Sequence, residues 1–198
     1  MTSIAAPAVL ADRLVAHRSV ATDVALVTGG AALTALLAQV AIPLWPVPIT
    51  GQTLAVLVVG ASLGAARGAA SLALYAVLGV VGLPIFSDGA SGLGVLMGTT
   101  GGYILGFIAA AALTGWLAER RWDRRFLGAV VAMTAGTLVT FAFGMTWLAV
   151  ATGGSLEQIL AWGLVPFIPG GIVKALLAAA ILPIAWRGVR ALDARRGQ

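Results

Sequence analysis

Side chains with catalytic or metal-binding chemistry are scarce in this chain of 198 residues. It has no cysteine, which excludes disulfide bonds, thiolate metal sites and a cysteine nucleophile. It has one histidine, His17, which excludes a multi-histidine metal site and disfavours a Ser-His-Asp triad. The sequence also lacks a G-x-x-x-x-G-K-[ST] phosphate loop, so the chain does not hydrolyse ATP by that route. We therefore predict that it is not an enzyme and has no cofactor of its own.

Charged residues are few as well, at 10% of the chain against 60% hydrophobic, and the mean hydropathy is +1.02. This composition predicts an all-α polytopic membrane protein. A membrane domain, residues 21–190, is expected between a cytoplasmic leader, 1–20, and a basic cytoplasmic tail, 191–198. A tight turn at Ala65-Ala66-Arg67-Gly68 is expected to separate the second and third spans. The apolar runs predict six transmembrane helices, at residues 23–42, 52–66, 68–84, 101–118, 126–151 and 166–187.

The arginines predict the orientation of these spans. They precede the first span, lie between the second and third and between the fourth and fifth, and follow the sixth. With both termini in the cytoplasm, every arginine is cytoplasmic, as the positive-inside rule requires. The opposite loops contain only Asp88 and Glu157 as charged residues. The +5 net charge therefore indicates membrane topology and not nucleic-acid binding.

The segments on the opposite side are long, apolar and rich in proline and glycine. They cover residues 43–52, 83–103 and 152–171. Proline and glycine disfavour helices and regular sheets, so irregular backbone is expected here. Ordered apolar loops of this length are typical of lids over a binding site. The alternative is that they only pack over the helix ends.

The single lysine, Lys174, lies inside the last apolar run, shortly after Pro169-Gly-Gly171. A cation near the middle of a span costs roughly 2.5–3.5 kcal/mol on insertion scales. A Pro-Gly-Gly break at membrane depth is tolerated only where protein or a wet cavity surrounds it. These two features predict a polar ligand bound within the membrane. The alternative is that the lysine stem extends to the headgroups.

Five segments together resemble the BioY family of biotin-specific substrate-binding subunits (S components) of energy-coupling factor transporters. They are Pro46-Val-Pro-Ile-Thr-Gly-Gln-Thr-Leu54, Gly64-Ala-Ala-Arg-Gly68, Leu74-Tyr-Ala-Val-Leu-Gly-Val-Val-Gly-Leu-Pro-Ile-Phe86, Gly98-Thr-Thr-Gly-Gly-Tyr-Ile-Leu-Gly-Phe107 and Pro166-Phe-Ile-Pro-Gly-Gly-Ile-Val-Lys174. The resemblance implies high-affinity binding and uptake of biotin across the cytoplasmic membrane of a prokaryote. It also implies two kinds of partner, a transmembrane coupling protein and a pair of ATPases that hydrolyse ATP. On sequence grounds alone, ordinary internal packing explains the small residues of the first helix. Such residues contact the coupling protein in that family, so the resemblance implies Ala31, Ala35 and Ala38 as the partner interface.

Two positions depart from the family pattern. The last family motif usually reads Pro-Gly-Asp-x-x-Lys, and here the acidic position is Gly171. An Asp three residues before Lys174 would share its helical face, so its absence leaves the lysine without a local counter-ion. An S component with altered specificity for a vitamin or small carboxylate is therefore an alternative. The second departure is Thr99, where the family usually has proline.

The candidate ligand-binding residues supply the contacts that a small bicyclic urea with a carboxylate tail requires. Lys174 and Tyr103 are the main candidates, for a charge-assisted bond and a hydroxyl contact. Gly101 and Gly102 lie at the start of a predicted helix, where their N–H groups can bind an anionic or carbonyl oxygen of the ligand. Close packing is the alternative explanation for both glycines. A membrane-embedded enzyme and a structural assembly protein are alternatives from other classes. The remaining candidates are Thr50, Gln52, Thr100, Gly171 and Asp88 as polar or positional contacts, and Phe86 and Trp45 as apolar cover.

Overall fold

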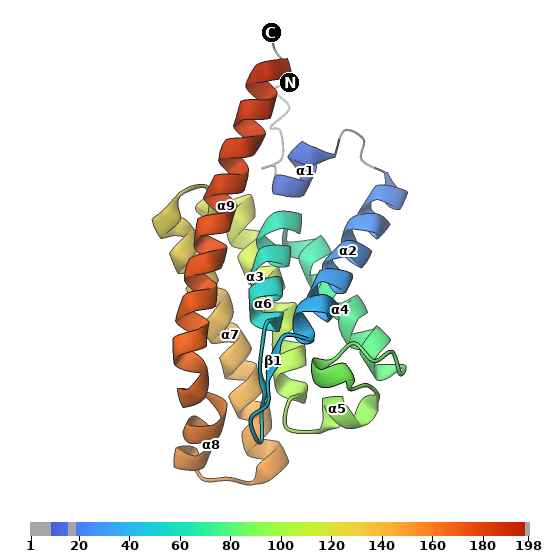
Figure 1. Ribbon diagram of the computed structural model, residues 1–198, viewed down its shortest axis with the longest axis vertical. Coiled ribbons are helices and arrows are strands. Elements are labelled where there is room, and N and C mark those ends of the chain that lie inside the picture. Colours follow the sequence, from blue (N-terminus) through green and yellow to red (C-terminus); the bar gives the residue numbers. More distant parts are fainter. Residues whose placement is uncertain (1–8, 16–18, 197–198) are drawn as a thin grey trace, which may run out of the picture.

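Helices that run mostly along the long axis of the molecule make up the structure (Figure 1). The computed structural model describes residues 9–15 and 19–196, with side chains as far as Ala191. The α-helices are α1 Leu10–Leu14, α2 Val20–Ala38, α3 Gln52–Leu63, α4 Ala65–Val80, α5 Leu93–Met97, α6 Gly101–Glu119, α7 Phe126–Thr152, α8 Leu156–Gly163 and α9 Ile168–Arg196. The other elements are strands β1 Ala41–Ile42 and β2 Ile49–Thr50, and 3-10 helices η1 Ser87–Gly89, η2 Trp122–Arg124 and η3 Val165–Phe167.

Among the described residues, four segments are long and apolar enough to cross a membrane, which confirms the membrane class. They are α2, α6, α7 and the stretch Leu156–Ala191, which covers α8 and α9 as far as Ala191. Helices α3 and α4 are apolar but shorter, with 12 and 16 residues, against the roughly 20 that a perpendicular span needs. The six helices α2, α3, α4, α6, α7 and α9 all lie near the predicted spans. That all six cross the membrane remains a prediction.

Helix α6 lies at the centre of the bundle, in contact with α3, α4 and α7. Small residues allow this close approach, as is common between helices in membranes. A Cβ atom added at Gly60 of α3 would lie 2.2 Å from Thr114 Oγ1 and 2.5 Å from the Ala111 carbonyl oxygen of α6. The centre of the bundle therefore has no room for a side chain at position 60.

The turn between α3 and α4 lies at Gly64, earlier than the predicted 65–68. Gly64 has φ +89°, a conformation that glycine adopts without steric cost. Arg67 therefore belongs to the first turn of α4. Its guanidinium donates to Asp12 over 2.5 Å and to Asp23 over 3.2 Å, so it holds α1 and α2 against the turn.

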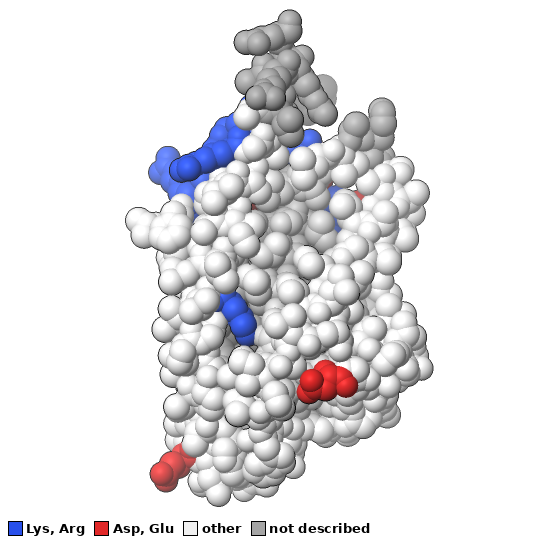
Figure 2. Space-filling model, viewed as in Figure 1, with Lys and Arg blue, Asp and Glu red and all other residues white. Residues whose placement is uncertain are grey.

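Basic side chains gather at the end of the molecule where α1 and the C-terminal end of α9 lie (Figure 2). Arg124 lies over the Trp186 ring at 4.2 Å, and the Trp186 Nε1 donates to the buried Asp123. Burial raises the pKa of Asp123. The hydrogen bond from Trp186 acts in the opposite direction, and the effect of burial is the larger. Burial is also the main cause of the lowered pKa of Arg124, and three arginines add to it, namely Arg121, Arg13 and Arg190.

The predicted terminal segments are only partly described. In the leader 1–20, Val9 and Leu10 are buried where α1 packs against α3 and α9. This part of the leader is therefore integrated into the bundle, while His17 and Arg18 fall outside the described residues. The backbone of the tail 191–198 continues α9 as far as Arg196.

The proline- and glycine-rich segments contain more regular structure than the sequence predicts. Strands β1 and β2 pair antiparallel, with Ala41 opposite Thr50. The prediction of irregular backbone is wrong for α8, which begins with a capping box in which Ser155 and Gln158 each accept a hydrogen bond from the other's backbone N–H. The predicted Pro169-Gly-Gly171 break is also wrong, because these residues form the first turn of α9, where proline needs no N–H partner.

Candidate functional site

A cavity of about 330 Å³ lies between the β1–β2 segment, the 86–100 segment, α3, α6, α7 and α9. Its volume falls within the usual range for small-molecule sites. Residues far apart in the sequence meet here, since the lining comes from most of the bundle. Seven of the predicted ligand-binding residues line it: Thr50, Gln52, Phe86, Asp88, Thr100, Tyr103 and Lys174.

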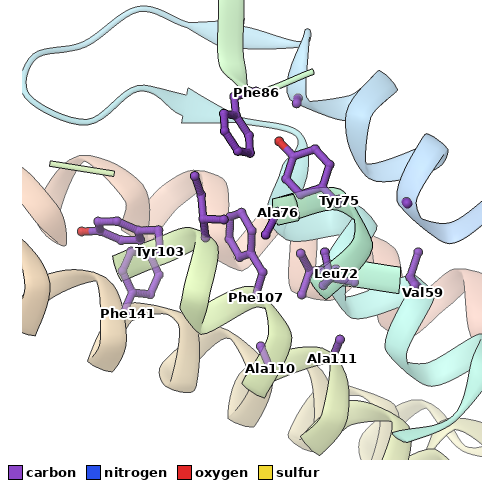
Figure 3. Packing of buried hydrophobic residues seen from close by; sticks show 14 of the residues in the cluster. Val59, Leu72, Tyr75, Ala76, Phe86, Tyr103, Phe107, Ala110, Ala111 and Phe141 are labelled. Atoms are coloured by element: carbon purple, nitrogen blue, oxygen red, sulfur yellow. The ribbon is translucent and has the colours of Figure 1, made fainter. Parts of the chain in front are cut away.

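Aromatic rings form much of the apolar wall. Phe167 stacks on Tyr103 with ring centres 6.3 Å apart, and its edge meets Phe141 at 5.9 Å. On another side the wall contains Phe86, whose ring meets the buried Tyr75 ring behind it edge to face at 5.4 Å. Figure 3 shows Phe86 with Tyr75 and, away from them, Tyr103 with Phe141. Phe141 and Phe167 were not predicted, because phenylalanines in apolar runs carry no sign of whether they face a ligand or lipid.

The Lys174 side chain is the cation of this cavity. Its Nζ donates a hydrogen bond to the Thr50 carbonyl oxygen, which joins α9 to strand β2. Among the described residues no carboxylate pairs with it, and Asp88 is the other charged group of the lining. A half-buried ammonium with only a neutral acceptor favours an anionic ligand group, since a charge leaving water needs compensation.

A chain of hydrogen bonds continues from Thr50 into the bundle. The Thr50 hydroxyl donates to Gln52 Oε1 over 2.7 Å, and Gln52 Nε2 donates to the Tyr75 hydroxyl over 2.6 Å. Tyr75 donates in turn to the Ile85 carbonyl over 3.2 Å. Thr50 and Gln52 therefore form part of the polar framework of the cavity, as well as its surface.

The comparisons with known proteins agree with this geometry. A model of the BioY family matches residues 9–191. The chain belongs to the BioY family. It is 36% identical to the biotin transporter BioY of Rhizobium etli over 81% of this chain and 89% of that protein, and 36% identical to the biotin transporter BioY2 of Lactococcus lactis over 77% and 83%. The crystal structure of the S-component for biotin from an ECF-type ABC transporter superposes with a TM-score of 0.77, at 25% identity over 86% of this chain and 95% of that one.

The two departures from the usual BioY motifs have distinct surroundings. An added Cβ at Gly171 would meet nothing within 4 Å, and Gly171 lines a smaller crevice of about 20 Å³ together with Lys174. The space that an Asp would occupy is therefore open. Thr99 donates through its hydroxyl to the Pro46 carbonyl over 2.7 Å, a contact between two cavity walls that a proline could not make.

Four predicted ligand-binding residues do not line the cavity, namely Gly101, Gly102, Trp45 and Gly171, the last of which lines the smaller crevice. Added Cβ atoms at Gly101 and Gly102 would lie 1.6 Å from the Leu96 carbonyl oxygen and 2.1 Å from the Cβ of Trp147. Both glycines therefore serve close packing. Trp45 is 78% exposed and packs edge to face on Trp162 at 5.5 Å.

The hydroxyl of Tyr103, although its ring lines the cavity, donates to the Gly163 carbonyl over 2.8 Å. Its proton is therefore used within the protein, and the hydroxyl contact predicted for Tyr103 would need this bond to be shared or exchanged. Among the described residues, no group of three His, Cys, Asp or Glu side chains could hold a metal ion.

The predicted partner residues of the first helix face the interior. Ala31 and Ala38 are buried, and Ala35 packs against the hydrophobic core. The helix register explains this result, because α2 places these positions against α3 and α4. A different set of small residues is exposed on α2, namely Ala21, Ala25, Thr28, Gly29 and Ala32.

Proposed function

We propose that this chain binds biotin within the cytoplasmic membrane of a prokaryote and takes it up as the S component of an energy-coupling factor transporter. The observation that carries the proposal is Lys174, a cation without a carboxylate partner among the described residues, in a cavity with aromatic walls. The names of the relatives and the biotin S-component structure support the same ligand. The BioY family is a transporter family, so the chain is no enzyme.

In this proposal the carboxylate of biotin binds Lys174, and the apolar bicycle packs against Phe141, Phe167 and Tyr103. Biotin supplies the negative charge that the missing Asp at position 171 would otherwise bring. The carboxylate replaces the Thr50 carbonyl as the acceptor for Lys174, and charge-assisted bonds are stronger than neutral ones. The missing Asp at position 171 therefore does not require a ligand other than biotin.

Equilibrium binding of biotin to the purified protein in detergent tests this function. We expect saturable binding with one biotin per chain, measured by isothermal titration calorimetry. Biotin amide, which lacks the negative charge, is expected to bind at least about tenfold more weakly, since charged hydrogen bonds contribute roughly 1.5–3 kcal/mol. A folded, monodisperse protein that binds no biotin would refute the proposal.

The proposed transporter contains a coupling protein and two ATPases, and the exposed face of α2 suits the contact with the coupling protein. Ala21, Ala25 and Gly29 are spaced four residues apart on this face, and an added Cβ at Gly29 would meet nothing within 4 Å. Small residues at this spacing allow a partner helix to approach closely. The six helices α2, α3, α4, α6, α7 and α9 are proposed to span the membrane, with the basic end of Figure 2 in the cytoplasm.

The substitution Gly29→Leu is expected to separate coupling from binding. The new side chain points out of the subunit, so biotin affinity should stay within about twofold of the wild type. Copurification with the coupling protein and ATP-dependent biotin uptake should fall about tenfold or more, because the partner helix is held away. Ala142→Leu, at an exposed alanine of α7, is the matched control. Equal uptake by both variants would exclude this face of α2.

A further inference from the structure

The cavity contains one buried hydroxyl that the bonding described so far does not use. Ser87, in the 3-10 turn η1, lines the cavity, and its Oγ is buried without a hydrogen-bond partner among the described residues. Buried polar atoms are nearly always paired, and one left alone is destabilising. A buried, unpaired hydroxyl on a residue that lines the cavity therefore indicates a bond that forms with the ligand.

Five further hydroxyls of the cavity lining are already engaged as donors, and the hydroxyl of Thr53, another lining residue, is not among the buried unpaired atoms. Each of the five donates its single proton to an oxygen of the protein, so each can offer a ligand only an acceptor. These hydroxyls belong to Thr50, Thr99, Thr100, Tyr103 and Thr140. Ser87 differs from them because its proton has no acceptor in the described protein.

The turn that carries Ser87 is held in place by Gln39, the residue that follows the last residue of α2. Gln39 Nε2 donates to the Phe86 carbonyl over 3.1 Å, and Gln39 Oε1 accepts from the Gly89 N–H over 3.1 Å. The two bonds hold the backbone on either side of Ser87. The turn also contains Asp88, whose φ is 56°. A hydroxyl on a fixed turn is preorganised, so less conformational freedom is lost when a ligand binds.

We propose that the Ser87 hydroxyl donates a hydrogen bond to the urea carbonyl oxygen of biotin, and that Gln39 positions the turn for this contact. The inference rests on the proposed function and specifies its polar contacts. Lys174 is matched to the carboxylate by charge, which leaves the urea oxygen as the acceptor that needs a donor. The two N–H groups of the urea can then donate to hydroxyl oxygens of the cavity, whose protons are engaged elsewhere.

Calorimetric titration of Ser87→Ala with biotin tests this contact. A neutral hydrogen bond predicts affinity about three- to tenfold below that of the wild type. The melting temperature of the ligand-free variant should be unchanged or higher, because no bond within the protein is lost. Ser91→Ala, at an exposed serine of the same segment that does not line the cavity, should bind like the wild type. Wild-type affinity in Ser87→Ala would overturn the inference, as would a lower melting temperature with unchanged binding.

An analogue with a thiocarbonyl in place of the urea carbonyl identifies the ligand atom. Sulfur accepts hydrogen bonds weakly, so the loss of affinity in Ser87→Ala should largely disappear with this analogue. An equal loss with both ligands would overturn the assignment to the urea oxygen. If the wild type binds no biotin, the proposed function fails. If the wild type binds and Ser87→Ala binds equally well, only the inference fails.

Discussion

Replacement of Lys174 by alanine is expected to weaken biotin binding by between about 30-fold and several thousandfold. Loss of one partner from a buried charge pair costs about 2–5 kcal/mol, because the remaining charge stays out of water without compensation. In the variant the biotin carboxylate would enter the cavity with no cation among the lining residues that the structure describes. Calorimetric titration of the purified variants measures the effect.

Two further variants and one ligand analogue separate the effect of the Lys174 charge from that of its packing. Lys174→Met keeps most of the apolar stem, and should lose affinity nearly as strongly as the alanine variant. Arg187→Ala removes an exposed cation from the same helix and should leave binding unchanged. Biotin amide carries no charge that would be left uncompensated, so it should bind Lys174→Ala and Lys174→Met at least as well as biotin does. Wild-type affinity in both Lys174 variants would mean that the ammonium only joins α9 to the Thr50 carbonyl.

Gly102→Ala is expected to lower both stability and biotin affinity. The added Cβ would lie 2.1 Å from the Cβ of Trp147 and 2.6 Å from the Phe143 carbonyl oxygen, so α6 and α7 would have to separate. Overpacking of this kind costs typically 1–3 kcal/mol, which corresponds to a fall in melting temperature of roughly 2–12 °C. Trp147 also donates to the Gly98 carbonyl over 2.9 Å, and Gly98 lines the cavity. The distortion therefore reaches the ligand site.

The matched control for this prediction is Gly188→Ala in α9. An added Cβ there meets nothing within 4 Å, and alanine favours a helix more than glycine does. Its melting temperature should stay the same or rise slightly, with unchanged biotin affinity. Thermal unfolding followed by circular dichroism, together with titration, checks both variants. A Gly102→Ala protein that melts and binds like the wild type would show that α6 and α7 are free to move apart.

The sequence predicts the helices well because long apolar runs have few alternative structures. Each predicted span lies near a helix of the structure, and Lys174 lines the cavity, while its part in ligand binding stays a prediction. Helix α8 was missed because the proline and glycine content of its segment obscured the capping signal of Ser155 and Gln158. Whether the short helices α3 and α4 cross the membrane depends on their tilt and surroundings, which the apolar runs do not specify.

The site could be predicted only where chemistry distinguishes a residue from its neighbours. A lysine in an apolar run is conspicuous, whereas Phe141 and Phe167 resemble the lipid-facing residues around them. The exposed small residues of α2, proposed above as the contact with the coupling protein, could not be told from the buried ones in the sequence. Alanine is so frequent in this helix that the spacing of Ala31 and Ala35 fits as well as that of Ala21 and Ala25, and only packing against α4 determines which pair is buried.

The contact between Trp45 and Trp162 has a practical consequence. It joins the connection between β1 and β2 to helix α8, two segments that meet through the edge of one indole and the face of the other. Indole emission responds to neighbouring rings and to water, so the pair is an optical reporter already present in the native chain. Separation of the two segments during a transport cycle would change the fluorescence of the protein without any attached dye.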